Sequence, residues 1–408
     1  MPNLKTAVKN VVRPAVQPLL EWRAYQKLPA LAKDAIKRDH DTPLPAQDPG
    51  AQAIIDAALE WLCHAQDKST SKDGGVARHW GYLDGWAASY PETTGYIVPT
   101  FLRQAEVKGD AQLRARAKKM LDWLVSIQFE NGGFQGGVIG QEPVVPVTFN
   151  TGQILLGLAA GARIWPDAYL EPMRKAADFI ATSLDADGCW RRYPTPFASH
   201  DDKSYETHVS WGLFEAARVE ANDDWVAAAN RQIDWAMTHQ RSNGWMDQCC
   251  LSDKTMPISH TLGYALRGFV EAWRYTQEER HLSAALNLAE GLRSQLHENG
   301  FLPGAFYSDW SAAADWACVT GVVQIAHSWL LLFEATQDEK WLDAGTRANA
   351  WARRTVVLEH KDVALAPTLG AVKGSHPCDG DYCRLEFPNW AAKFMIDSCQ
   401  QDIDLRAT

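Results

Sequence analysis

The chain has 408 residues, of which 46% are hydrophobic and 22% charged, and this balance supports a large buried core and excludes a disordered chain. Its net charge of −10 is spread along the chain without a basic tract, which argues against nucleic acid as a partner. No apolar run reaches the length of a transmembrane helix, and residues 1–25 lack the continuous apolar segment of a signal peptide. We therefore expect a cytoplasmic protein.

Residues 1–50 precede the regular part of the chain, and their pattern indicates a helical arm followed by a proline-rich linker. Within them, residues 15–37 are typical of one or two helices with a break near Pro29. One hypothesis is that this basic segment contacts a membrane surface. We favour an arm that packs on the following domain, because Glu21 and Asp34 dilute the positive charge.

A short phrase built on Asn-Gly or Asp-Gly recurs through the rest of the chain. Its glycines are Gly132, Gly188, Gly244 and Gly300, each 56 residues after the previous one, and a looser copy lies at Gly74. A fixed period identifies the building unit of a repeat protein. Glycine takes the left-handed conformation that ends a helix, and Asn or Asp tolerates the turn beside it. Each copy therefore marks the end of a helix.

Each unit of the repeat contains two helices of different character. The first is amphipathic, and we expect it at about residues 51–66, 110–127, 168–184, 222–240, 276–296 and 338–354. The second is more apolar, and we expect it at about residues 91–106, 147–164, 204–219, 258–274, 317–336 and 386–399. A helix that is apolar on all sides must be buried on all sides, so the second helix lies inside and the first outside.

Six outer and six inner helices in alternation can close into a ring. An open solenoid needs polar capping repeats at its ends, whereas the first and last inner helices here are as apolar as the middle ones. We therefore predict an all-α fold, an (α/α)6 barrel or toroid, over residues 51–408.

The rhythm of a helix followed by Gln-x-x-Asn-Gly and an aromatic residue resembles that of the α/α-toroid superfamily. This superfamily includes six-hairpin glycosidases, barrel-type polysaccharide lyases, sugar 2-epimerases, glucuronyl C5-epimerases, terpene cyclases and prenyltransferases. The resemblance covers about residues 51–400, and residues 90–96 look most similar to proteins of bacterial surface-polysaccharide pathways. The resemblance implies a carbohydrate substrate.

In such a barrel, the loops that feed the inner helices meet at one wide mouth, where helix N-termini offer free N–H groups and partial positive charge. Carboxylates beside aromatic residues are the combination that glycoside hydrolysis uses. Glu92 and Glu206 begin inner helices two units apart, so we predict that both reach a central pocket as catalytic groups. Asp84, in a Gly-flanked aromatic loop, is a third candidate. The alternative is that the Glu residues only complement helix dipoles and that Asp84 is a turn residue.

His208 and His260 lie on inner helices and are candidates for general acid–base catalysis, since the ordinary pKa of His lies near neutrality. The alternative is that each is a core residue with satisfied hydrogen bonds. Together with Asn150, Tyr264 and Arg267, His208 also permits a different reaction. A lyase or epimerase removes the proton α to the carboxylate of a uronic acid with such a set of residues.

Substrate-binding residues are expected at the same mouth, as aromatic side chains that stack on sugar rings and polar ones that bind their substituents. They are Tyr82, Trp86, Tyr90, Tyr96, Asn150, Tyr205, Trp211, Tyr264, Arg267, Trp316 and Glu386. We expect no metal and no other cofactor, because the Cys-x4-Cys spacing within residues 376–383 is not a standard zinc pattern.

These patterns favour a carbohydrate-active enzyme that hydrolyses a glycosidic bond in an acidic bacterial polysaccharide or oligosaccharide. Lyase or epimerase chemistry through His208, His260 and Tyr264 is the alternative. A third hypothesis is a non-catalytic toroid that binds a glycan or scaffolds polysaccharide biosynthesis, since fold does not decide function. An enzyme is expected to have a deep pocket with converging acids of perturbed titration, and a scaffold is not. The pattern leaves the oligomeric state open.

Overall fold

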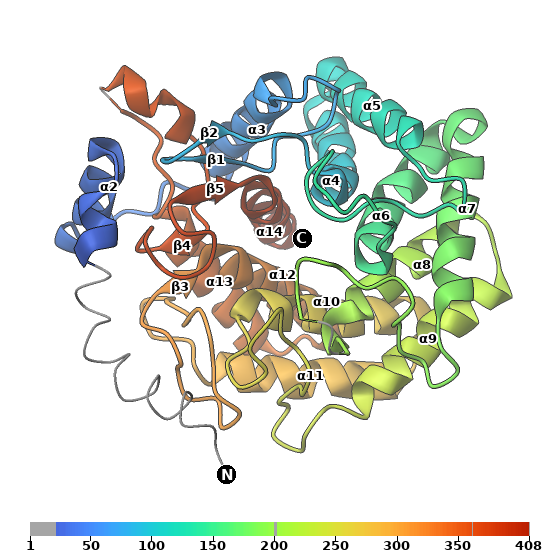
Figure 1. Ribbon diagram of the computed structural model, residues 1–408. Helices are drawn as coiled ribbons and strands as arrows, with labels where there is room; N and C mark the ends of the chain where they lie inside the picture. The colour runs from blue at the N-terminus through green and yellow to red at the C-terminus, as the bar shows by residue number, and fades with distance from the viewer. Residues whose placement is uncertain (1–21, 200–201, 361, 408) are drawn as a thin grey trace, which may run out of the picture.

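The computed structural model describes residues 22–199, 202–360 and 362–407. It is a ring of helical hairpins in which an inner helix follows each outer one (Figure 1). The outer helices are α3 (Ala51–Lys68), α5 (Ala111–Ser126), α7 (Pro166–Ser183), α9 (Asp223–Met237), α11 (Glu279–Arg293) and α13 (Glu339–Arg353). The inner helices are α4 (Pro91–Lys108), α6 (Thr148–Ile164), α8 (Thr207–Val219), α10 (Ser259–Thr276), α12 (Val319–Thr336) and α14 (Asn389–Ala407). Each inner helix packs on the next, and α14 returns to α3 and α4, which confirms the predicted (α/α)6 toroid.

The recurring glycines join each outer helix to the next one around the ring. A Cβ on Gly132, after α5, would collide with the backbone carbonyl of Lys175 in α7, so only glycine allows this close approach. Gly370 makes the same contact with Ala57 in α3, the first outer helix, and so closes the ring. This sixth copy lies 70 residues after the fifth, because an insertion with the short helix η2 (Val363–Thr368) interrupts the period. All six glycines have a positive φ, between 71° and 107°.

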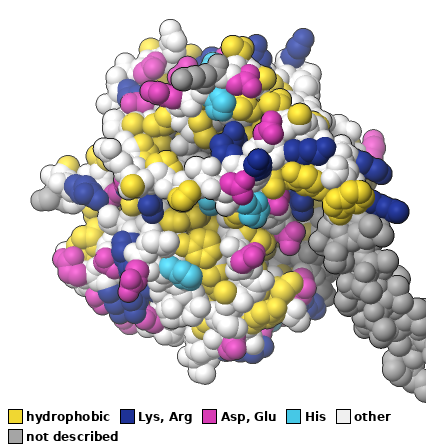
Figure 2. All heavy atoms as spheres, turned by 90° about the vertical axis from the view of Figure 1, so that its left-hand side faces the viewer, with side chains coloured by type: hydrophobic (Ala, Val, Ile, Leu, Met, Phe, Trp, Pro, Cys, Tyr) yellow, Lys and Arg dark blue, Asp and Glu magenta, His cyan; other side chains and the backbone are white. Residues whose placement is uncertain are grey.

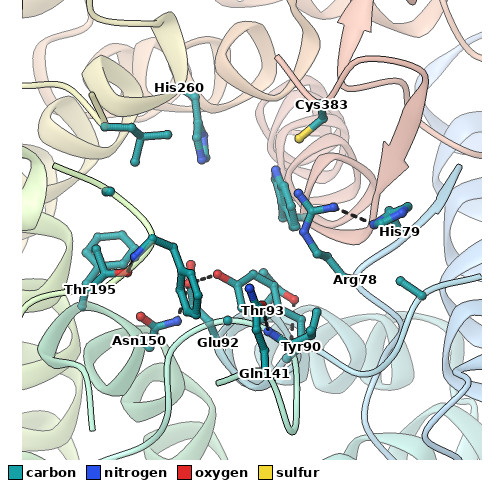
Figure 3. A pocket seen from close by; sticks show the side chains of 18 of the residues that line it. Arg78, His79, Tyr90, Glu92, Thr93, Gln141, Asn150, Thr195, His260 and Cys383 are labelled. Atoms are coloured by element: carbon teal, nitrogen blue, oxygen red, sulfur yellow. Dashed lines mark hydrogen bonds between the residues drawn. The ribbon is translucent and has the colours of Figure 1, made fainter. Parts of the chain in front are cut away.

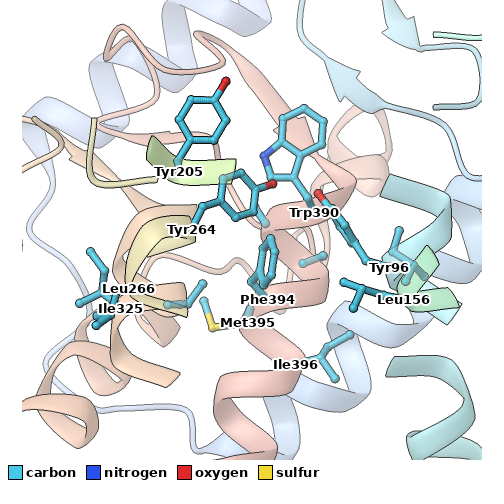
Figure 4. Packing of buried hydrophobic residues seen from close by; sticks show 14 of the residues in the cluster. Tyr96, Leu156, Tyr205, Tyr264, Leu266, Ile325, Trp390, Phe394, Met395 and Ile396 are labelled. Carbon is cyan, nitrogen blue, oxygen red and sulfur yellow. The ribbon is translucent and has the colours of Figure 1, made fainter. Parts of the chain in front are cut away.

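Aromatic side chains fill the middle of the barrel (Figure 4). Tyr96 of α4, Tyr264 of α10 and Phe394 of α14 are buried there, with 5.3 Å between the ring centroids of Tyr96 and Phe394 and 6.2 Å between those of Tyr264 and Phe394. Aromatic pairs at such separations stabilise a core beyond the burial of their area. The filling separates a large cavity, where the inner helices begin, from a smaller chamber nearer their ends.

Short strands tie together the loops at the mouth of the ring. The strands are β1 (His79–Gly81), β2 (Gly85–Trp86), β3 (Ala317–Cys318), β4 (Ser375–His376) and β5 (Glu386–Pro388). β1 pairs antiparallel with β2 on one side and β5 on the other, and β3 pairs with β4. Because Trp80 lies opposite Phe387, the loop before the first inner helix is joined to the loop before the last.

A helical turn over residues 22–26 and α2 (Ala30–Asp41) precede the ring and lie outside it (Figure 1). The predicted break is confirmed, since Pro29 directly precedes α2. Buried Asp39 accepts hydrogen bonds from Nζ of Lys373 at 2.6 Å and from the backbone N–H of Cys378 at 3.0 Å, so α2 packs on the loop before β5. Residues 15–21 of the predicted arm lie outside the described residues. The domain boundary at residue 50 and the membrane-surface hypothesis stay predictions.

The face of the molecule that carries α2 has acidic and basic side chains interspersed with each other (Figure 2). This mixture accords with the sequence, which has 40 Lys and Arg residues against 50 Asp and Glu residues. Within the described residues, none of the helices combines the length and apolar character that a membrane span requires.

Candidate active site

A cavity of about 710 Å³ opens at the mouth of the ring, where the inner helices begin (Figure 3). Its titratable lining residues other than tyrosine are Arg78, His79, Glu92, His260, Cys383 and Glu386. Its aromatic lining residues are Tyr90, Tyr96, Phe149, Phe197, Tyr205, Tyr264, Tyr382 and Trp390. A concave pocket with an aromatic wall and a few converging polar groups is typical of a small-molecule site.

Glu92 lies in the first turn of α4 and is buried in the cavity wall. Pro91 supplies the first helical residue, where its missing N–H is not needed, so Glu92 stands at the helix N-terminus. Its Oε2 accepts hydrogen bonds from the hydroxyl of Tyr90 at 2.8 Å and from Nδ2 of Asn150 at 2.7 Å (Figure 3). Burial raises the pKa of Glu92 to about 7, although the Tyr90 hydrogen bond and the charge of Arg78 oppose this rise. Near neutral pH, Glu92 can therefore both hold and release a proton.

Arg78 and Glu386 form an ion pair on another part of the wall, where β1 and β5 run side by side. Nη1 of Arg78 donates to Oε2 of Glu386 at 2.7 Å. The guanidinium also lies over the ring of Trp390, with Cζ 5.3 Å from the ring centroid. The guanidinium also interacts with the thiol of Cys383, whereas Nε and Nη2 donate to no nitrogen or oxygen of the described residues, so donor capacity remains for an anionic group in the cavity.

His260 lies in the first turn of α10 and points into the cavity (Figure 3). Its Nδ1 lies 2.7 Å from Oε1 of Gln324, and because that oxygen accepts, Nδ1 carries the ring proton. Nε2 is then an acceptor with no hydrogen-bond partner among the described residues. Burial lowers the pKa of His260 to about 4, although the Gln324 hydrogen bond opposes this change. His260 is thus a neutral base at neutral pH.

The tyrosines of the wall remain protonated, because burial raises the pKa of all five well above its usual value. They are Tyr90, Tyr96, Tyr205, Tyr264 and Tyr382. The ring of Phe149 meets those of Tyr205 and Tyr264 edge to face, with centroids 5.3 Å and 5.4 Å apart. The wall therefore offers both hydroxyl donors and fixed aromatic surfaces to a ligand.

Eight of the residues predicted from the sequence line this one cavity, and the ring closure brings them together from five inner-helix segments. They are Tyr90, Glu92, Tyr96, Asn150, Tyr205, His260, Tyr264 and Glu386. Their roles in catalysis and binding stay predictions.

Glu206 does not line the cavity, although its neighbour Tyr205 does. It ends a 3₁₀ turn, η1 (Ser204–Glu206), which turns Tyr205 toward the cavity and Glu206 away from it. Burial raises the pKa of Glu206 to about 8, although the positive charge of Lys203 opposes this rise. The structure therefore separates Glu206 from Glu92, contrary to the expected common pocket.

Asp84 and His208 lie outside the cavity for different reasons. Asp84 is exposed and accepts a hydrogen bond from Nε2 of His79 at 3.1 Å. Since Nδ1 of His79 accepts from Nη1 of Arg78 at 2.6 Å, Asp84 reaches the wall only through that ring. His208 is sealed in the core, with Nδ1 2.6 Å from Oε1 of Gln153 and Nε2 without a partner among the described residues.

Three predicted stacking residues pack inside the loops instead of facing the cavity. The ring centroid of Tyr82 lies 5.1 Å from that of Trp80, and the ring centroid of Trp86 lies 5.4 Å from that of Trp61. Trp316 packs against two loop glycines. These side chains bury apolar surface beneath the mouth and present no face to the cavity.

Trp211 and Arg267 line the smaller chamber at the other end of the barrel. Arg267 lies over the indole, with Cζ 4.4 Å from the ring centroid. Trp211 lies three positions after His208 in α8, and Arg267 lies three positions after Tyr264 in α10. Three positions are nearly one helical turn, so both side chains lie farther from the mouth.

Among the lining residues, Arg78 was not singled out in the sequence, whereas Tyr382, Cys383 and Trp390 lie in the loop and first turn that lead into the last inner helix, which were expected at the mouth without a role for each residue. Arg78 and Glu386 are 308 residues apart in the chain and meet only because β1 pairs with β5. Arg78 directly precedes the loop of residues 79–86, which leads to the first inner helix. Because that loop was expected at the mouth, its position was the hint that Arg78 lies there.

Comparisons with known proteins bear on the fold of the chain. No protein-family model matches the sequence, and no curated protein matches it either. Among solved structures, an unsaturated glucuronyl hydrolase specific for heparin is similar at a TM-score of 0.69 and 15% identity, covering 89% of this chain and 99% of that one. Cellobiose 2-epimerase from Bacillus thermoamylovorans has a TM-score of 0.67 and 13% identity, covering 86% of this chain and 97% of that one. A D-mannose isomerase has a TM-score of 0.68 and 12% identity, covering 89% of this chain and 100% of that one. The chain thus has the six-hairpin glycosidase-like (α/α)6 toroid fold that these sugar enzymes share.

Proposed function

We propose that this chain is a carbohydrate-active enzyme and that its reaction is glycosidic hydrolysis of an acidic saccharide. The observation that carries the proposal is that two carboxyl groups in unlike environments line one cavity. Glu92 has only neutral hydrogen-bond donors and a pKa of about 7, whereas Glu386 is paired with a guanidinium. The fold shared with a glucuronyl hydrolase, a 2-epimerase and an isomerase supports a sugar as the ligand.

The two environments suit the two roles that hydrolysis requires. Glu92, protonated in a good fraction of molecules at neutral pH, donates its proton to the leaving glycosidic oxygen. Glu386, beside Arg78, acts as the carboxylate that activates water or attacks the sugar.

Arg78 supports an acidic substrate. Its Nε and Nη2, which donate to no nitrogen or oxygen of the described residues, form the two-pronged donor that matches a carboxylate. Burial against Trp390 removes competing water from one side of the guanidinium, which strengthens such a contact. The uronic acid carboxylate is the sugar substituent that this group binds best.

The experiment compares Glu92→Gln with Glu206→Gln. Both glutamates are buried, and burial raises the pKa of both, but only Glu92 lines the cavity. Turnover is measured on a panel that includes saturated and unsaturated uronyl disaccharides, cellobiose and mannose. Loss of a general acid lowers kcat by about 10² to 10⁴, so we expect this loss for Glu92→Gln and near-normal turnover for Glu206→Gln. A folded Glu92→Gln protein with full activity would end the hydrolase proposal.

A second candidate function rests on His260. As a neutral base whose Nε2 has no protein partner, it can remove a proton from a sugar carbon, as an epimerase or lyase does. Tyr264, with its ring centroid 4.4 Å from that of His260, is the neighbouring hydroxyl that could return the proton.

Isotopes from the solvent distinguish the two reactions. Hydrolysis incorporates ¹⁸O from labelled water into the product and leaves the sugar carbons unlabelled. Proton abstraction in ²H₂O places deuterium on a ring carbon of product or recovered substrate. Deuterium incorporation that His260→Gln abolishes, without ¹⁸O incorporation, would make the epimerase or lyase reaction the function.

A further inference from the structure

A second chamber lies on the barrel axis beyond the aromatic filling, and no step proposed above uses it. Its volume is about 190 Å³, against 710 Å³ for the main cavity, and all six inner helices contribute to its wall. Tyr96 lines both spaces. Apart from Tyr96, the charged and titratable residues of the chamber are Arg103, Arg163, Glu215, Arg267, Arg274, His327, Lys393 and Asp397.

Helix dipoles explain only part of this positive charge. Arg163 and Arg274 lie in the last turns of their helices, where a cation complements the partial negative charge of the helix end, and each is paired with a carboxylate. Arg267, His327 and Lys393 lie well inside α10, α12 and α14, where the dipole effect has faded. Arg267 and Lys393 each have a carboxylate partner one turn further along the helix, Glu271 and Asp397, whereas His327 has none, and all three residues line the same chamber.

His327 offers a hydrogen-bond donor that no described residue accepts. Its Nδ1 lies 3.1 Å from Nη1 of Arg267, and because a guanidinium can only donate, Nδ1 accepts and the ring proton sits on Nε2. The residue is 5% exposed, so bulk water does not serve this donor freely. Burial lowers the pKa of His327, and the charges that lower it further, led by Arg267 and Lys393, are all positive. The chamber is therefore electropositive at this ring.

Lys393 is also incompletely paired. It is 3% exposed, and one of its three ammonium N–H groups donates to Oδ2 of Asp397 at 2.8 Å. The second oxygen of that carboxylate is taken by the hydroxyl of Thr100 at 2.7 Å. The rest of the ammonium lies over the rings of Phe394 and Tyr96, with Nζ 4.1 Å and 5.2 Å from their centroids, so its two other N–H groups meet aromatic faces and no nitrogen or oxygen of the described residues.

From these spare donors in one small chamber we infer that the chamber binds a small oxyanion of the phosphate and sulfate class, with Nε2–H of His327 and Nζ of Lys393 as its donors and Arg267 beside His327. An oxyanion supplies several acceptor oxygens to donors of different direction and neutralises the excess positive charge. The small volume favours the free anion over a phosphorylated sugar. This binding is independent of the reaction proposed for the main cavity.

The test is thermal unfolding in inorganic phosphate against sodium chloride of equal ionic strength. A ligand at about a hundred times its Kd raises the Tm of a chain of this length by about 3 °C. We expect this rise for the wild type and its loss in Lys393→Met, whose affinity for phosphate should fall about tenfold or more. Lys118→Met is the matched control, because Lys118 forms the same i,i+4 pair with Asp122 but on the exposed side of an outer helix. An equal response of wild type and Lys393→Met, or no response beyond that to chloride, would overturn the inference.

Two further measurements cover the other outcomes. A crystal of the wild-type protein soaked in selenate, a sulfate analogue, is expected to show an anomalous selenium peak in the chamber, which keeps the inference testable if Lys393→Met does not fold. Peaks confined to other places would contradict it. Glucose 6-phosphate is expected to leave the Tm unchanged, and a rise that occurs with this ester but not with phosphate would overturn the assignment of a free anion.

Discussion

The two ends of the same six inner helices treat a buried glutamate in opposite ways. Glu92 at the mouth and Glu271 near the narrow end are 7% and 1% exposed, and burial alone would raise the pKa of each. At the mouth only neutral donors contact the carboxylate, and its pKa rises to about 7. At the narrow end Arg267 and Arg274 pair with Glu271 and hold its pKa below the ordinary value. The partner, and not the burial, decides the protonation state.

This difference predicts a division of labour between the two ends. At the narrow end the charges are paired, and removing one partner of such a pair is costly. The unpaired carboxyl at the mouth costs stability, as reactive groups in enzymes commonly do. Substitutions at the narrow end should therefore act on folding, and those at the mouth on turnover.

The largest effect is expected from Glu271→Gln. Removing one partner of a buried ion pair leaves the other charge uncompensated, and we expect a loss of about 3 to 5 kcal/mol in the free energy of unfolding. Urea unfolding measures it, with the exposed Glu279→Gln as the control. At temperatures where the variant is folded, kcat should equal that of the wild type. A loss below about 1 kcal/mol would mean that solvent already screens this pair.

Glu92→Gln should instead stabilise the protein, and only at high pH. The pKa of Glu92 rises from 4.5 in the unfolded chain to about 7 in the folded one, so between these values the unfolded chain releases a proton that the folded chain retains. The wild type therefore loses stability as the pH rises through this window, by about 3 kcal/mol in total, and a glutamine escapes this loss. Unfolding at pH 4 and pH 8 should show a gain for the variant only at pH 8. A surface control, Glu60→Gln, should show no such gain, and an equal gain at both pH values would refute this account of Glu92.

Arg78→Met should lower kcat/KM for an acidic saccharide by about a hundredfold, since truncation of a buried charged contact costs roughly 2 to 5 kcal/mol. A neutral saccharide should lose much less, because it has no carboxylate for Nε and Nη2 of Arg78 to bind. Kinetics on a matched pair of substrates measures the ratio, with the exposed Arg241→Met as the control. Equal losses on both substrates would indicate that Arg78 serves Glu386 alone.

The fold could be predicted from the sequence because its rules are local and periodic. A glycine every 56 residues and the alternation of amphipathic and apolar helices predicted the twelve helices. Their observed ends lie within three residues of the expected ones, except that α14 continues to Ala407, eight residues beyond its expected end. The sequence analysis did not identify Gly370 as a sixth copy of the repeated glycine, because an insertion interrupts the period before it. The contact of Gly370 with Ala57 nevertheless completes the ring. The local sequence pattern therefore predicted the helical hairpins, but it did not predict the contact between Gly370 and Ala57 that closes the ring.

The site could be predicted only where one helical turn determines it. Glu92 was found because the first turn of an inner helix faces the mouth, yet the same rule failed for Glu206, where a 3₁₀ turn changes the direction of the side chain. Arg78 requires the pairing of β1 with β5 across 308 residues, which no local pattern encodes. The cavity wall is thus a product of ring closure.

The smallest effect is expected from Asp84→Asn, which tests this lesson directly. The sequence offered Asp84 as a catalytic acid equal to Glu92, but the Asp84 side chain is 60% exposed and touches the wall only through Nε2 of His79. An asparagine oxygen can accept the same hydrogen bond, and the loss of one exposed charge changes stability by about 0.5 kcal/mol or less. Turnover should stay within about twofold of the wild type, since no proton passes through Asp84. A hundredfold loss in kcat with an unchanged Tm would show instead that Asp84 reaches the substrate, and the catalytic pair would then span the mouth from Asp84 to Glu92.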